Sequence, residues 1–122
     1  MVLIVESNAT LAALWQRHLE RLGRRVLVAQ TDEDAYTLLR EVTFEVIILD
    51  LVLEQGSALS VSDYASYRQP DARVIFVTNT SFFSDGSIFQ HCANACAFVT
   101  SATAPADLAA MADHYGQPRL TA

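Results

Sequence analysis

Short runs of apolar residues, most of them branched, recur along the chain at residues 2–5, 26–29, 46–49, 74–77 and 97–99. Runs of this length are typical of strands that are covered on both faces, as in a parallel sheet. Between them, apolar positions return with helical spacing, as at Leu11, Leu14, Trp15 and Leu22 before Gly23. The pattern therefore predicts strands and helices in alternation.

Capping signals delimit the predicted helices. Thr31 and Asp34 resemble a capping pair for a second helix, and Gly56-Ser57 begins a third that ends near residues 69–70. Ser84 and Asp85 offer caps for a fourth helix carrying Ile88, Phe89, Cys92 and Cys96, with both thiols on one buried face. Thr103 and Pro105 suit the start of a fifth helix, which Gly116 ends.

Five strands alternating with five helices predict a doubly wound α/β fold with one parallel sheet and helices on both faces. Right-handed crossovers place the carboxyl ends of strands one, three, four and five along one rim, where ligands of such sheets bind. We expect a single domain over residues 1–116 and a tail over 117–122, since 122 residues with 52% apolar content can bury one core.

Composition narrows the function classes. The net charge is −6 and all eight basic residues are arginine, which disfavours nucleic acid as a partner. Arg17, Arg21, Arg24 and Arg25 form a local cluster, interpreted as a solvated helix face in preference to an acidic-partner patch. No apolar segment is long enough to span a membrane and no leader pattern is present, so a soluble cytoplasmic protein is expected.

Polar residues follow the strands that should end on the rim. Glu6 and Ser7 follow the first strand, Asp50 ends the third, Thr78 follows the fourth, and Ser101 lies just beyond the fifth. Asp50 closes an uninterrupted apolar run and precedes a loop, which places one carboxylate at the opening of a buried strand. It is the leading functional candidate.

This order of motifs resembles the receiver domain of two-component response regulators over nearly the whole chain. The matching segments are Val-Glu at the end of the first strand, Ile-Ile-Leu-Asp-Leu-Val-Leu followed by Gly-Ser-Ala-Leu, and Val-Ile-Phe-Val-Thr in the fourth strand. The resemblance implies strand order 2-1-3-4-5, a flavodoxin-like receiver fold, and a phosphorylatable aspartate at Asp50. It also implies Mg²⁺ held by Glu6, Asp50 and the backbone carbonyl of Val52.

The resemblance further assigns phosphoryl binding and switching to Thr78, Phe98 and Ser101. Two positions depart from the family pattern, because Ser7 replaces the second acidic ligand and Ser101 replaces a lysine, in a chain without any lysine. Losing one negative charge beside a divalent ion weakens its binding. We therefore expect weak phosphorylation. The interval from Thr78 to Phe98 also looks one residue longer than usual in the family.

Two functions stay open at this point. The first is a receiver that accepts a phosphoryl group from a histidine kinase or a phosphotransfer protein. The second is a pseudo-receiver that acts without phosphorylation, as a homodimer or by binding another signalling protein, with Phe82, Phe83 and Phe89 as the partner interface. An enzyme is not expected, because Val52 stands where an aspartate phosphatase needs its second aspartate and no P-loop motif occurs.

Overall fold

The computed structural model describes residues 1–53, 56–78 and 94–117, which form a five-stranded parallel sheet with the strand order β2-β1-β3-β4-β5. The strands are β1 (Val2–Val5), β2 (Val26–Ala29), β3 (Val46–Asp50), β4 (Arg73–Thr78) and β5 (Ala95–Thr100), and the helices are α1 (Ala9–Arg21), α2 (Asp32–Glu41), α3 (Ala58–Arg68) and α4 (Pro105–Tyr115). The doubly wound fold and its strand order are as predicted.

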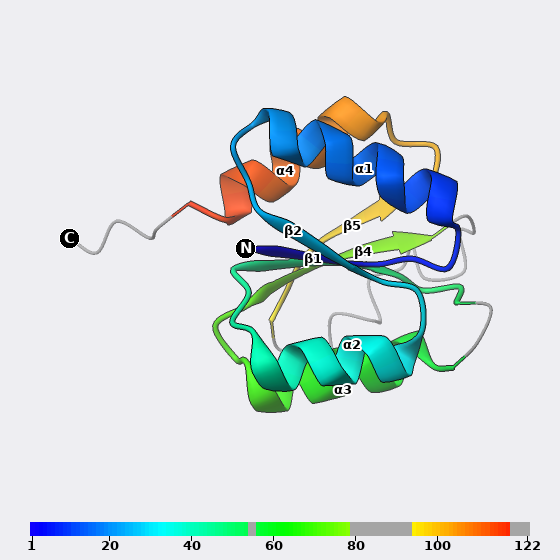
Figure 1. The fold of residues 1–122 in the computed structure, drawn as a ribbon, viewed down its shortest axis with the longest axis vertical. Helices are drawn as coiled ribbons and strands as arrows, with labels where there is room; N and C mark the ends of the chain where they lie inside the picture. Colours follow the sequence, from blue (N-terminus) through cyan, green and yellow to red (C-terminus); the bar gives the residue numbers. More distant parts are fainter. Residues whose placement is uncertain (54–55, 79–93, 118–122) are drawn as a thin grey trace.

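Helices cover both faces of the sheet: α1 and α4 lie on one face, and α2 and α3 on the other (Figure 1). Successive side chains of a strand point to opposite faces of the sheet, so the core consists of two clusters, one on each face. Leu3 and Val5 of β1 pack under α2 and α3, whereas Val2 and Ile4 pack with Trp15 on the α1 side. Strands β1 and β3 are fully buried up to Leu49, which is why their sequences read as continuous apolar runs.

Short polar side chains begin three of the helices. Asn8 Oδ1 accepts a hydrogen bond from Leu11 N at 3.0 Å, Thr31 Oγ1 from Asp34 N at 3.2 Å, and Ser57 Oγ from Ser60 N at 3.2 Å. The Thr31–Asp34 pair is therefore confirmed as a cap. Helix α4 begins at Pro105 as predicted, but Thr103 does not cap it. Ala104 occupies the cap position and makes no side-chain cap bond.

The prediction that Cys96 lies on a helix is wrong, because Cys96 belongs to β5. Its neighbours Ala95 and Ala97 pair with Val74 and Ile75 of β4, so the register shifts by one residue at Cys96. Such a bulge breaks the alternation that would have marked the strand, and the i, i+4 spacing of two cysteines suggested a helix instead. The rest of that predicted helix, with Cys92, lies outside the described residues.

The arginine cluster divides into two groups. Arg17, Arg21 and Arg25 are exposed, as expected of a solvated face. Arg24 is half-buried: its Nε donates to Asp113 Oδ1 at 2.8 Å, and its two terminal nitrogens donate to the carbonyls of Asp113 and Gly116 at 2.9 and 3.3 Å. A cation at the carboxyl end of a helix stabilises the exposed carbonyls. Arg24 thus fastens the end of α4 to the α1–β2 turn.

Neutral amides hold together the amino edge of the sheet. Gln69 Nε2 donates to the carbonyls of Leu39 and Val42 at 2.9 and 2.6 Å, and Gln69 Oε1 accepts from Phe44 N at 2.8 Å. Asn94 adds a bond to the carbonyl of Ala72 at 2.7 Å. These bonds join the ends of α2 and α3 to the strands that follow them. Within the described residues, no helix has the length and apolar character needed to cross a membrane.

Candidate functional site

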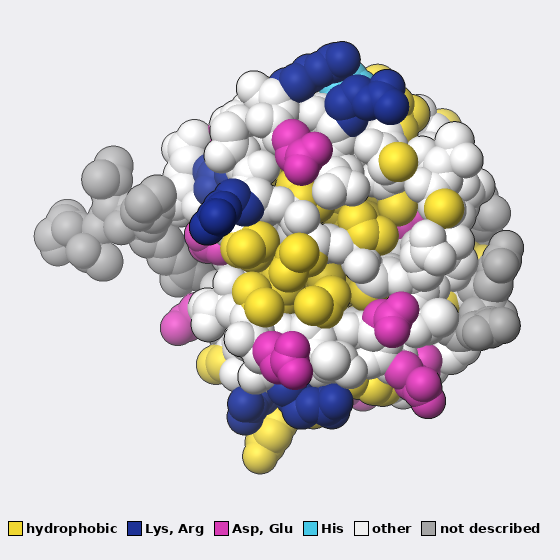
Figure 2. Space-filling model, viewed as in Figure 1, with side chains coloured by type: hydrophobic (Ala, Val, Ile, Leu, Met, Phe, Trp, Pro, Cys, Tyr) yellow, Lys and Arg dark blue, Asp and Glu magenta, His cyan; other side chains and the backbone are white. Residues whose placement is uncertain are grey.

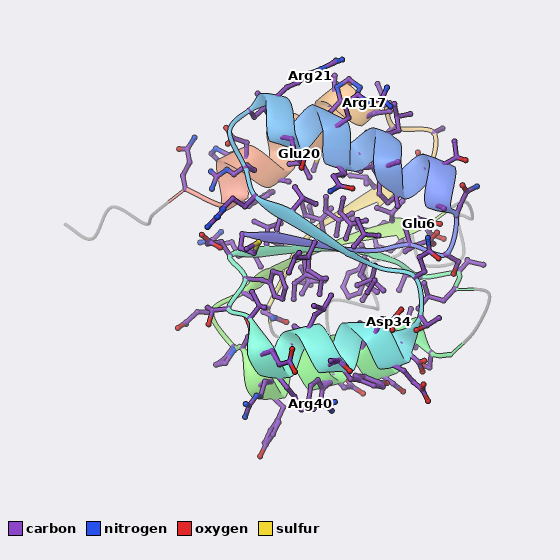
Figure 3. The ribbon with its side chains drawn as sticks, viewed as in Figure 1. Glu6, Arg17, Glu20, Arg21, Asp34 and Arg40 are labelled. Atoms are coloured by element: carbon purple, nitrogen blue, oxygen red, sulfur yellow. The ribbon has the colours of Figure 1, made fainter. Side chains whose placement is uncertain are left out.

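The ends of β1, β3 and β4 meet at the carboxyl edge of the sheet. Val5 pairs with Leu49, and Asp50 pairs with Val77, so Glu6, Asp50 and Thr78 follow one another across three adjacent strands. Neighbouring strands lie about 4.8 Å apart. The sheet therefore gathers the three predicted site residues at one edge, the right-hand end of the sheet in Figure 1, where Figure 3 places Glu6.

Glu6 is an almost fully buried carboxylate, with 3% of its surface exposed. Its Oε1 accepts a hydrogen bond from the backbone N–H of Asn8 at 3.0 Å, and Asn8 in turn caps α1. The first turn of α1 contains no acidic residue of its own, so the Glu6 carboxylate lies beside the positive end of that helix. Ser7, between them, is half-buried.

Asp50 ends β3 and is half-buried. Its Oδ1 accepts a hydrogen bond from Val52 N at 2.8 Å, a local turn that starts the loop after the strand. Leu51 N donates to Val77 O at 2.8 Å and continues the pairing with β4 one step further. Val52 itself is 51% exposed. Asp50 is therefore held by its own loop at the point where solvent reaches the sheet.

Thr78 is completely buried at the end of β4, opposite Thr100 of β5. Its carbonyl accepts a hydrogen bond from Ser101 N at 2.7 Å, which fixes Ser101 immediately beyond the strand, and Ser101 is exposed. Phe98 is half-buried, pairs with Phe76 and packs against the core under α2 and α3. The fold therefore brings Thr78 and Ser101 to the Asp50 edge, whereas Phe98 lies within the strand that leads there.

The bulge at Cys96 bears on the spacing between Thr78 and Phe98. Val74 of β4 pairs with Ala95 of β5, but the next residue, Ile75, pairs with Ala97. Cys96 is therefore one extra residue in β5, and the regular pairing resumes at Ala97. The register shift precedes Phe98, and beyond it Phe98 pairs with Phe76 and Thr100 with Thr78. The added length stays a prediction, because most of the interval, residues 79–93, lies outside the described residues.

A contact that sequence reasoning missed joins the Asp50 loop to α2. Asp32, at the start of α2, accepts hydrogen bonds from Glu33 N at 2.8 Å and from Ser57 N at 3.3 Å. Gly56 has φ +90° and lies so close to the Asp32 carboxylate that a Cβ there would overlap it. Only a glycine fits this approach. The Gly56-Ser57 pair indicated a turn in the sequence, but nothing in the sequence indicated that Asp32 would contact this turn.

The donor set at this edge consists of oxygens, the ligand type that Mg²⁺ prefers. It offers the carboxylates of Glu6 and Asp50 and the carbonyl of Val52. No three His, Cys, Asp or Glu side chains come together as a metal cluster within residues 1–53, 56–78 and 94–117. These oxygen ligands are thus of the type that fits Mg²⁺.

The family model for the response regulator receiver domain matches residues 2–112. The chain therefore belongs to the receiver domain family of two-component response regulators. Among curated proteins, none matches this chain.

The predicted partner surface of Phe82, Phe83 and Phe89 lies outside the described residues.

Solved structures agree with this assignment. A response regulator protein from Burkholderia pseudomallei, described with a phosphorylated aspartic acid, a calcium ion and citrate, is 26% identical with a TM-score of 0.82, covering 94% of this chain and 67% of that one. A CheY-like receiver domain protein from Methanospirillum hungatei has a TM-score of 0.85 at 20% identity, covering 94% and 91%. DrrB, a Thermotoga maritima OmpR/PhoB homolog, is 26% identical with a TM-score of 0.75, covering 89% and 48%.

Proposed function

We propose that this receiver domain accepts a phosphoryl group on Asp50 from a histidine kinase or a phosphotransfer protein, and does so weakly. The observation that carries the proposal is the shared edge of Glu6, Asp50 and Thr78, with Asp50 half-buried and open to solvent while the other two are buried. A carboxylate in this position can attack a phosphorus atom, and a threonine hydroxyl can donate a hydrogen bond to a phosphoryl oxygen.

Mg²⁺, held by Glu6, Asp50 and the Val52 carbonyl, would neutralise charge on the phosphoryl group. Ser7 supplies a neutral hydroxyl where the family pattern has a carboxylate, so the attraction for the ion falls. Ser101 is fixed at the strand end by its N–H, but a serine offers no positive charge for the phosphoryl oxygens. Both differences reduce transfer.

The proposal is tested by incubation with acetyl phosphate and Mg²⁺, followed by intact mass measurement. We expect a small fraction of the protein to gain one phosphoryl group, and none in Asp50→Asn. Ser7→Asp combined with Ser101→Lys should increase the labelled fraction, because it returns the ligand and the cation. Ser101→Ala serves as the matched control and should not increase it. Absence of labelling in both wild type and the restored variant would refute Asp50 as an acceptor.

A second candidate is favoured by Ser7 and Ser101 themselves. In this function the domain is a pseudo-receiver that signals by binding a protein or a second copy of itself, independently of phosphorylation. It predicts that Asp50→Asn leaves partner binding unchanged, whereas the first function predicts that partner binding responds to acetyl phosphate. In either case we propose a cytoplasmic signalling protein that catalyses no turnover of a substrate.

A further inference from the structure

The outer edge of β2 is an unpaired strand edge within the described residues. Strand β2 ends the sheet and pairs only with β1. Val2 N donates to Arg25 O at 2.8 Å, and Glu6 N donates to Ala29 O at 3.0 Å. Because successive residues of a strand direct their backbone groups to opposite edges, those of Val26, Val28 and Gln30 point away from the sheet. Such a row of donors and acceptors is a template for another strand.

The side chains around this edge are apolar in the middle. Leu27 and Val28 are half-buried and pack toward the two cores, one on each face of the sheet. Figure 2, which looks onto this edge, shows apolar side chains gathered at the centre of the face between α1 and α2, with charged groups around them. An apolar centre with a polar rim is the usual composition of a protein interface.

Charges of opposite sign lie at the two ends of the strand. Arg25 is exposed directly before β2, and the first turn of α2, directly after it, contains Asp32, Glu33 and Asp34. Arg25 shares its face of the sheet with Leu27 and Ala29, which pack beneath α2. Helix α2 repeats the pattern, with Asp34 near its start and Arg40 near its end (Figure 3). A surface of this kind is complementary to itself after rotation by half a turn.

We propose that two copies of this chain pair antiparallel through β2 and form a continuous ten-stranded sheet. With Val28 opposite Val28 of the second copy, Val26 lies opposite Gln30, and all three outward-facing residues find partners. In this register Arg25 lies opposite Thr31 of the second copy, beside its acidic turn, and Asp34 approaches Arg40. Each attraction occurs twice by symmetry. The proposal deepens the pseudo-receiver function and does not depend on phosphorylation of Asp50.

Sedimentation velocity over a concentration series tests the proposal. Wild type should form a dimer as concentration increases. Arg25→Glu should weaken it roughly tenfold or more, because each reversal replaces two attractions with repulsions. Adding Glu33→Arg to Arg25→Glu should restore much of the loss. Arg17→Glu, an equal charge change on the outer side of α1, is the control and should have little effect.

Val28→Pro removes one outward N–H and leaves the pairing with β1 intact, so it should give a folded monomer by circular dichroism and sedimentation. Amide hydrogen exchange at Val28 and Gln30 should slow as wild type is concentrated.

A wild type that stays monomeric up to its solubility limit overturns the proposal. A dimer that Arg25→Glu leaves intact overturns it as well, by assigning another face. Asp50→Asn should dimerise like wild type, whatever the outcome of the acetyl phosphate experiment.

Discussion

The amino edge and the carboxyl edge of the sheet, where the parallel strands begin and end, carry different kinds of polar side chain. At the amino edge, Gln69 and Asn94 satisfy backbone groups of neighbouring elements with neutral amides. At the carboxyl edge, Glu6 and Asp50 bring two carboxylates to adjacent strand ends. The first arrangement lowers the energy of the folded chain, whereas the second places like charges side by side. The stabilising amides and the proposed chemistry therefore lie at opposite ends of the same strands.

Replacing Gln69 should have the largest effect on stability. Gln69→Ala leaves the N–H of Phe44 and the carbonyls of Leu39 and Val42 without their side-chain partner in a partly buried place, which should cost about 2–4 kcal/mol of unfolding free energy. Urea denaturation measures it. Gln16→Ala, a half-buried glutamine on α1, should change the free energy by only about 0.5 kcal/mol or less. An equal loss of unfolding free energy in the two variants would contradict the role of Gln69 in stabilising the amino edge.

The next prediction compares one glycine from each edge. Gly23 and Gly56 both have positive φ, +84° and +90°, but only Gly56 lies against another group, the Asp32 carboxylate. Gly23→Ala should lower the free energy of unfolding by about 1 kcal/mol, from backbone strain alone. Gly56→Ala should lower it by about 2–3 kcal/mol, because the new Cβ also overlaps Asp32. Adding Asp32→Ala should recover much of the difference in a double-mutant cycle. If the cycle shows no coupling, the loop after Asp50 is not tied to α2.

A moderate effect is expected at Arg24. Arg24→Ala should cost about 1–2 kcal/mol in thermal or urea unfolding, since three bonds to the end of α4 disappear. Arg24→Lys should recover only part of this, because an ammonium cannot reproduce the planar fork. Arg21→Ala, exposed at the end of α1, is the matched control. Full rescue by lysine would show that charge alone holds α4.

The smallest effect should have the opposite sign. Asp50→Asn should raise the free energy of unfolding in metal-free buffer by about 0.5–1 kcal/mol, because it removes one of two neighbouring carboxylates. The Oδ1 acceptor for Val52 N is kept. Asp63→Asn, an exposed change of equal charge on α3, should be neutral. Destabilisation by Asp50→Asn would mean that Asp50 supports the fold as well as the site.

Much of this molecule could be predicted from its sequence. Buried strands leave continuous apolar runs, so β1 was predicted with its observed bounds, and the rim residues Glu6, Asp50 and Thr78 followed from the strand ends. Cys96 was misplaced because a bulge interrupts the strand pattern. The bonds of Gln69 and the contact of Asp32 with Gly56 leave no periodic signal, since they join side chains to backbone groups far away in the sequence.

The Gln69 bonds also bear on how such a domain changes over evolutionary time. They tie α2 and α3 to the sheet at the end that takes no part in the proposed chemistry. Substitutions at the rim can then accumulate while the chain still folds. A scaffold of this construction can outlast its original reaction and be recruited for recognition alone.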